Sequence, residues 1–370
     1  MATQTPKARR VFFHSKEAIA GTADTYEFFE GRSMEITFPE PTYLKESDMG
    51  KIGSGEHGTK TELQAIFTPF SIKAQRLSEI AYLMSYFMGT ADSVETIDTG
   101  VYSHQLKHLY TASRTLPTFT WDFSDTQTAS AADQFKHAII NDFSLTLAAG
   151  GNGVIDATFN GFANLHYDNS GVLTRNATVD NSSFSANHSF ASEPLINFKS
   201  CRFWVGTGLT ATPLVQTDVS FTAEDLAGSP TDICPLVNSI TITGNNGLNG
   251  EDLMRACGDG VLNNQERGDR AFTLEVNARR DTSTIAWDTL ALGDTSRALE
   301  IQFEGPVLSG TDIYAMNLFL PNVVPQSAAQ DDESPINQTV PFDVFEDTNY
   351  DAFYAYFQNG VADGLNATNT

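Results

Sequence analysis

The C-terminal part of this chain lacks basic side chains altogether. From Ala298 to Thr370 there is no Lys, Arg or His, and from Phe203 to Met254 there is no Lys or Arg. The chain of 370 residues carries a formal net charge of -24. Binding to a phosphate backbone depends on Lys and Arg, which displace its counterions. The composition therefore excludes a protein that binds nucleic acid through the phosphate backbone. Nucleic acid can still pass beside such a surface.

Cysteine is scarce, and its spacing carries no pattern. Cys201, Cys234 and Cys257 are far apart in the sequence, their number is odd, and no Cys-x-x-Cys pair exists. A disulfide framework or a zinc site is therefore not indicated. We expect buried free thiols.

Long hydrophobic runs are also absent. The most apolar segment, Ile80 to Met88, is about half of the ~20 residues that span a membrane. The apolar run Val11–Phe13 is too short for the core of a signal peptide. We expect a soluble protein that is made in a cytoplasm and has no membrane partner.

Catalytic signatures are missing as well. Gly53 to Gly58 fits G-x-G-x-x-G, but a charged stretch precedes it and no helix follows, so a flexible loop is the better interpretation. His104 and His108 share an i, i+4 spacing without a His-Glu-x-x-His motif, and no Gly-x-Ser-x-Gly elbow occurs. We predict no enzyme, and no catalytic, cofactor-binding or metal site.

The composition that remains favours β-structure. Hydrophobic residues make up 41% of the chain, Phe dominates the aromatics, and charged residues are few. Alternation with period two predicts strands. The predicted strands are 33–38, 63–67, 118–123, 143–147, 240–243, 272–276, 299–303 and 316–320.

One segment has helical spacing instead. Ala74, Leu77, Ile80 and Met84 recur at steps of three and four residues, and Gly89 follows. This predicts an amphipathic helix over 74–88. The segment 284–292 is a candidate for a second, shorter helix.

The order of these elements indicates a tandem duplication. A strand precedes each predicted helix, and the segment 140–147 resembles the segment 237–243, each being followed by a Gly/Asn cluster. We therefore predict two similar β domains, over residues 1–180 and 190–326, with the boundary in the polar stretch 176–190.

Two further segments look like arms. Residues 41–60 are rich in Gly and charge and have no apolar period, so we expect an extended arm that is disordered in the free subunit. The segment 327–370 is acidic and then aromatic. Its rings are too many for a solvated tail, so we expect them to be buried on the parent domain or on a neighbouring subunit.

The order of the elements as a whole resembles a known family. The features that carry the resemblance are Gly21-Thr22, the strand 63–67, Phe70, the helix that ends at Gly89, and the segments 116–120, 140–147, 160–161, 237–242 and 314–323. Over about residues 10 to 325 they resemble, in this order, the major tail tube proteins of long-tailed, non-contractile bacteriophages.

The resemblance implies a β-sandwich or barrel-like fold flanked by a helix, with rings stacked into a hollow tube and no enzymatic activity. It implies a place in the virion tail, with tape measure and terminator proteins as partners, and DNA that passes through without specific binding. If the chain carries two such folds, three copies complete a ring. An acidic inner wall would repel the phosphates of DNA. Candidate residues for that wall are Glu35, Glu300 and Gln302.

Two alternatives stay open. Trp121, Trp204 and Trp287 are also consistent with sugar platforms in a carbohydrate-binding or adhesin-type β-sandwich of a tail fibre or cell surface. The acidity is also typical of proteins from saline environments.

Overall fold

The computed structural model describes residues 10–16, 26–29, 33–36, 43–47, 56–60, 67–90, 93–107, 116–125, 132–165, 193–209, 226–248, 269–280, 292, 295–326, 329–330, 337–346, 351–362 and 364–365. Within these ranges the chain is mainly β, with one named α-helix, α1 (Leu77–Met88), and a short 3₁₀ helix, η2 (Phe198–Ser200). The prediction of a mainly β fold with few helices is confirmed. The strands of the first half are β1 (Arg10–Lys16), β2 (Tyr26–Phe29), β3 (Ser33–Ile36), β4 (Tyr43–Ser47), β5 (Glu56–Lys60), β6 (Phe67–Ala74), β7 (Ser93–Asp98), β8 (Val101–Lys107), β9 (Phe119–Asp125), β10 (Ala132–Ala148) and β11 (Asp156–Leu165).

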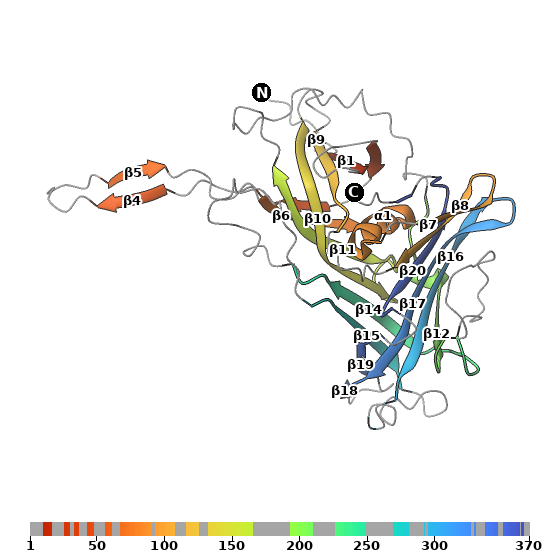
Figure 1. Ribbon diagram of the computed structural model, residues 1–370. Coiled ribbons are helices and arrows are strands. Elements are labelled where there is room, and N and C mark those ends of the chain that lie inside the picture. Colours follow the sequence, from red (N-terminus) through yellow and green to blue (C-terminus); the bar gives the residue numbers. More distant parts are fainter. Residues whose placement is uncertain are drawn as a thin grey trace, which may run out of the picture.

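The second half contributes the rest of the sheet. Its strands are β12 (Cys201–Gly206), β13 (Thr231–Asp232), β14 (Val237–Asn245), β15 (Ala271–Arg279), β16 (Arg297–Ser309), β17 (Asp312–Pro325), β18 (Ala329–Gln330), β19 (Asn337–Val344) and β20 (Tyr354–Asn359). All strands except β4 and β5 belong to one strongly curved, antiparallel sheet (Figure 1).

The long strand β10 joins the two halves of the chain. It pairs with β9 and β11 on the N-terminal side and with β14 on the C-terminal side. The two similar segments noted in the sequence thus lie side by side, with Leu145 opposite Ile242. The predicted domain boundary in 176–190 lies outside the described residues. In the part that is described, the two halves share one sheet.

The C-terminal strand makes a second connection between the halves. β20 lies between β8 and β17 and pairs with both of them. Every residue of β20 is buried, and so is the preceding Phe353. The expectation that the C-terminal rings are buried is confirmed for this strand, and the parent chain buries them. Phe345 is 48% exposed, which is an exception.

The helix lies inside the curved sheet and does not flank it. All residues of α1 are buried, and the helix contacts β8, β10, β17 and β20. The predicted helix is present, but its polar residues Ser78, Glu79 and Ser85 are buried as well, because a helix surrounded by protein buries its whole surface. It begins at Leu77 and not at Ala74, which belongs to β6. Gly89 ends it as predicted, with a φ of 85° that suits glycine.

A single main hydrophobic cluster extends from Phe70 to Leu365 and includes residues of both halves. Aromatic rings dominate it. Phe87 meets Phe143 edge to face at 4.7 Å, and Trp121 stacks on Phe135 at 3.9 Å between ring centroids. Such pairs add to the stabilisation that comes from burying the rings.

The arm 41–60 contains regular structure. β4 and β5 pair with each other as a separate two-stranded sheet, with Lys45 opposite Gly58. The prediction that this arm is disordered in the free subunit and ordered between stacked rings stays a prediction. Figure 1 shows this hairpin projecting far from the main sheet.

Candidate assembly surfaces

The projecting hairpin of β4 and β5 is the first candidate surface. An isolated two-stranded hairpin is at best marginally stable in water. In the described part of the chain, β4 and β5 pair only with each other. A second surface that supplies further hydrogen bonds or apolar contact would stabilise the hairpin, and its reach beyond the body suits contact with a neighbouring molecule. The glycine-rich motif Gly53–Gly58 ends inside β5, so Glu56 to Gly58 form strand and not a nucleotide-binding turn.

The convex side of the sheet over β6, β11, β10, β14, β15 and β19 is the second candidate surface. Along these strands buried apolar residues alternate with residues that are at least partly exposed. The outward residues are short and polar. We call them the hydroxyl–amide face: Ser71, Ser144, Thr146, Thr158, Asn160, Ser239, Thr241, Thr243, Asn245, Thr273, Asn277 and Thr339.

Hydrogen bonds between neighbouring strands tie this face together. Thr243 and Thr273 share one at 2.6 Å, and Thr146 and Thr241 share one at 3.2 Å. Asn277 Nδ2 donates to Thr339 Oγ1 at 2.9 Å. Such cross-strand pairs stabilise the sheet and use part of the face's own hydrogen-bonding capacity. A surface of this kind has fewer groups left with which to hold a passing polymer.

Charged side chains are sparse on the same strands. Among the outward positions whose exposure the structure describes, there are four acids and two bases, which are Asp142, Asp156, Glu275, Asp343, Lys73 and Arg279. The low number of bases keeps phosphate affinity low. The excess of acids is small, so the face is better described as polar and weakly acidic than as a wall of carboxylates.

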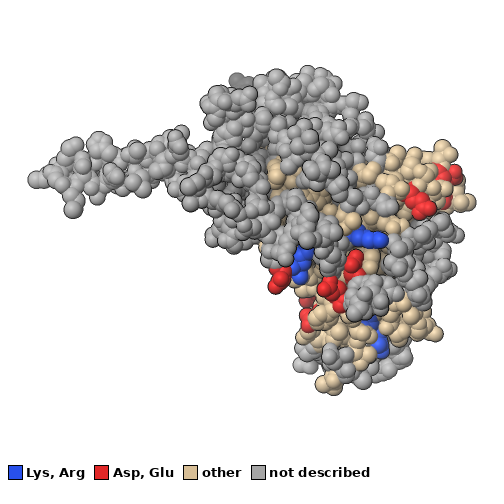
Figure 2. Space-filling model, in the orientation of Figure 1, with Lys and Arg blue, Asp and Glu red and all other residues tan. Residues whose placement is uncertain are grey.

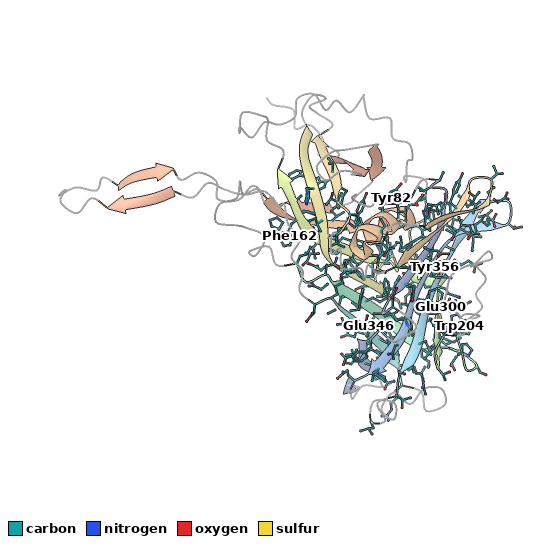
Figure 3. The ribbon with its side chains drawn as sticks, viewed as in Figure 1. Tyr82, Phe162, Trp204, Glu300, Glu346 and Tyr356 are labelled. Carbon is teal, nitrogen blue, oxygen red and sulfur yellow. The ribbon has the colours of Figure 1, made fainter. Side chains whose placement is uncertain are left out.

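Two of the candidate wall residues lie elsewhere. Glu300 and Gln302 face away from the main core, yet they are 0% and 1% exposed, and Gln302 Nε2 donates to Glu300 Oε1. Glu300 lies opposite Trp204 of the neighbouring strand β12, whereas Tyr356 lies on β20, beyond β17 (Figure 3). Their assignment to a solvent-facing wall is wrong in this chain, because both faces of β16 are covered here. Glu35 lies on β3 at the register position opposite Ser71.

The tryptophans differ in exposure. Trp121 is fully buried and stacked on Phe135, so it is not a sugar platform. Trp204 is partly exposed, on the other face of β12 from Phe203. Trp287 lies outside the described residues.

The two described cysteines are free thiols, as expected, but they are close together. Cys234 Sγ lies 3.4 Å from the carbonyl oxygen of Cys201. Burial raises the pKa of the Cys201 thiol far above its ordinary value, and the nearby Cys234 adds to the effect. The pKa of Cys234 is raised as well, mainly by burial. Thiols held in their protonated form are poor nucleophiles and poor metal ligands.

Histidine and carboxylate groups form no metal centre in the part of the chain that the structure describes. His104 is buried, and its Nε2 lies 3.0 Å from Asn359 Oδ1 and 3.1 Å from the carbonyl oxygen of Val361. It thus ties the end of β20 to β8. His108 lies outside the described ranges. No described helix is long and apolar enough to cross a membrane.

No protein-family model matches the chain, and no curated protein matches it significantly.

Proposed function

We propose that this chain is a structural subunit that polymerises as stacked rings into the tail tube of a long-tailed, non-contractile bacteriophage. The observation that carries the proposal is the projecting β4–β5 hairpin, whose strands pair only with each other in the described part of the chain. A hairpin of this kind gains stability when it docks on the next subunit. The subunit would belong to the virion and would act without catalysis.

The hydroxyl–amide face supports the second part of the proposal, a conduit for DNA. It is broad, its side chains are short, and cross-strand hydrogen bonds hold several of them in place. With few Lys and Arg to bind phosphates, DNA would slide past it without specific contacts. We assign the part of this face over β14, β15 and β19 to the inner wall, in place of Glu300 and Gln302.

The stoichiometry of three chains per ring belongs to the same proposal. It rests on the similar segments of β10 and β14 and on the idea that each chain carries two tube-like units. Open sheet edges such as β3 and β7, each with one described partner strand, are available for pairing between copies. Tape measure and terminator proteins would contact the inside and the end of the tube.

Electron microscopy of the purified chain tests the proposal. We expect rings or tubes from the intact chain. A variant that lacks residues 46–58, which removes the end of the hairpin, should fold with the same circular dichroism spectrum and form no long tubes. Long tubes from the deletion variant would show that the hairpin does not join rings. Discrete globules from the intact chain would favour the adhesin alternative.

A further inference from the structure

The end of the β16–β17 hairpin presents exposed apolar residues. Val307 is 63% exposed and follows the exposed Pro306, while the turn at Gly310 has a φ of 58°. The register of β20 with β8 and β17 places the β7–β8 turn beyond the same end of β20. Figure 2 shows acidic side chains at this end of the molecule. We call residues 305–313 the knob.

A surface pocket of about 320 Å³, largely open to solvent, lies on β6, β10 and β11. Its lining combines the apolar Pro69 and Phe162 with polar groups of Ser71, Asn160 and Asp142. Gly161 forms part of the lining, and any side chain there would collide with the carbonyl oxygen of Ile139. We call this pocket the socket. It is large enough for one or two small apolar side chains.

Hydrogen bonds fix the polar side of the socket. Asn160 Nδ2 donates to Asp142 Oδ1 at 2.6 Å, and Asn141 Nδ2 donates to Asp142 Oδ2 at 3.3 Å. The Asp142 carboxylate is therefore held in place at the lining. Lys73, two residues beyond Ser71 on β6, is exposed on the same face of the strand.

The knob and the socket lie on opposite sides of the subunit. Figure 3 shows Phe162 at the left, and Figure 1 shows the end of the β16–β17 hairpin at the far right. A chain therefore does not fill its own socket with its own knob. A projection on one side and a pocket on the other are the elements of a head-to-tail contact, which closes into a ring when the rotation allows it.

We infer that the knob of one chain, with Val307 at its end, inserts into the socket of a second copy of this chain. Val307 and Pro306 would contact Pro69 and Phe162, and Asp312 at the base of the knob would lie near Lys73. This inference deepens the proposed function, since a ring subunit needs a heterologous contact, and it names the residues of that contact.

A matched pair of charge variants tests the contact. Val307→Asp brings a like charge toward Asp142, whereas Val307→Lys brings an opposite charge to the same position. Both changes lie at an exposed hairpin end, so the folded subunit should tolerate them equally. Like charges in an interface are strongly unfavourable. We expect Val307→Asp to weaken self-association, measured by sedimentation velocity, at least about tenfold relative to Val307→Lys. The double variant Val307→Asp, Asp142→Asn should recover most of the loss.

Cross-linking supplies a second readout. Subunits that carry Val307→Cys are mixed with subunits that carry Pro69→Cys, and a bis-maleimide is added. Covalent pairs should exceed those from either variant alone. Equal association of the Asp and Lys variants, or cross-linking no higher than in the single variants, would overturn the contact. If tubes nevertheless form, the proposed function stands without it. Cross-linked rings that never stack into tubes would support the contact and contradict the tube.

Discussion

Glu193 holds the start of the buried helix through Ser78, 115 positions away in the sequence. One carboxylate oxygen of Glu193 accepts from the backbone N–H of Ser78 at 3.1 Å, and the other accepts from its hydroxyl at 2.7 Å. Glu193 is only 3% exposed. A negative charge at a helix N-terminus is stabilised there, because it accepts hydrogen bonds from N–H groups that have no partner within the helix and lies at the positive end of the helix dipole. The segment that begins the second half of the chain thus completes a helix of the first half.

Replacing Glu193 should therefore destabilise the whole fold. We expect Glu193→Ala to lower the free energy of unfolding by about 1–3 kcal/mol, because the buried donors of Ser78 lose their acceptor. Glu193→Gln keeps one acceptor and should cost less. Urea denaturation of both, with the exposed Glu275→Gln as control, measures this. Equal stability of the Ala variant and the control would show that the cap contributes nothing.

The glycine at position 161 is required by a close approach between strands. A Cβ there would lie 2.0 Å from the carbonyl oxygen of Ile139 and 2.8 Å from the ring of Phe70. Gly161→Ala should therefore cost about 1–3 kcal/mol or more, as over-packed sites do. A Cβ at Gly150 would meet nothing within 4 Å, so Gly150→Ala is the matched control. Thermal melts that shift alike for both variants would contradict this account.

Asp351 should make stability depend on pH. Burial raises its pKa above the ordinary 3.8, Lys107 opposes this, and Glu346 adds to the rise. The folded state therefore holds the proton more firmly than the unfolded state. The resulting stabilisation is present below about pH 3.8 and is lost as the pH rises through the folded-state pKa.

Asp351→Asn removes this titration. The variant should gain in melting temperature relative to the parent as the pH is raised from about 3.5 to 7. The backbone N–H of residue 351, which donates to Tyr354 Oη at 2.9 Å, is unchanged by the substitution. A difference in melting temperature that is constant with pH, or that shrinks as the pH rises, would show that Asp351 does not titrate in this way.

The hydroxyl–amide face should bind DNA more strongly when it gains positive charge. Thr243→Lys places an ammonium on this face in every copy, whereas Ser296→Lys places one at an exposed position that is not part of the face. Assembled tubes of the Thr243 variant should retain double-stranded DNA in a salt-dependent way. Tubes of the parent and of the Ser296 variant should retain much less. Retention that is equal in the two Lys variants would remove the face from the inner wall.

Local patterns in the sequence predicted much of the secondary structure. Alternation located β14, β15, β16 and β17, and Gly89 located the end of α1, because these signals depend on neighbours in the chain. The helix start was placed three residues early, since Ala74 fits a helical spacing and also the buried face of β6.

Local sequence patterns do not predict which strands pair when those strands are far apart in the chain. The similarity of the segments in β10 and β14 was visible, but their direct pairing was not, and neither was the insertion of β20 between β8 and β17. Glu300 illustrates the same limit. Its alternation with apolar neighbours predicted a side chain that faces away from the main core, and that much is correct. Its exposure depends on what covers the second face of the sheet, which one strand does not encode.

The central claim is that this chain builds a hollow tube, and a cryo-electron microscopy reconstruction of the assembly formed by the purified protein tests it most directly. The account predicts stacked rings of three chains around an open channel, with the β4–β5 hairpin bridging successive rings and Thr241 and Thr243 facing the channel. A solid filament, or particles that remain single chains at every concentration, would contradict it.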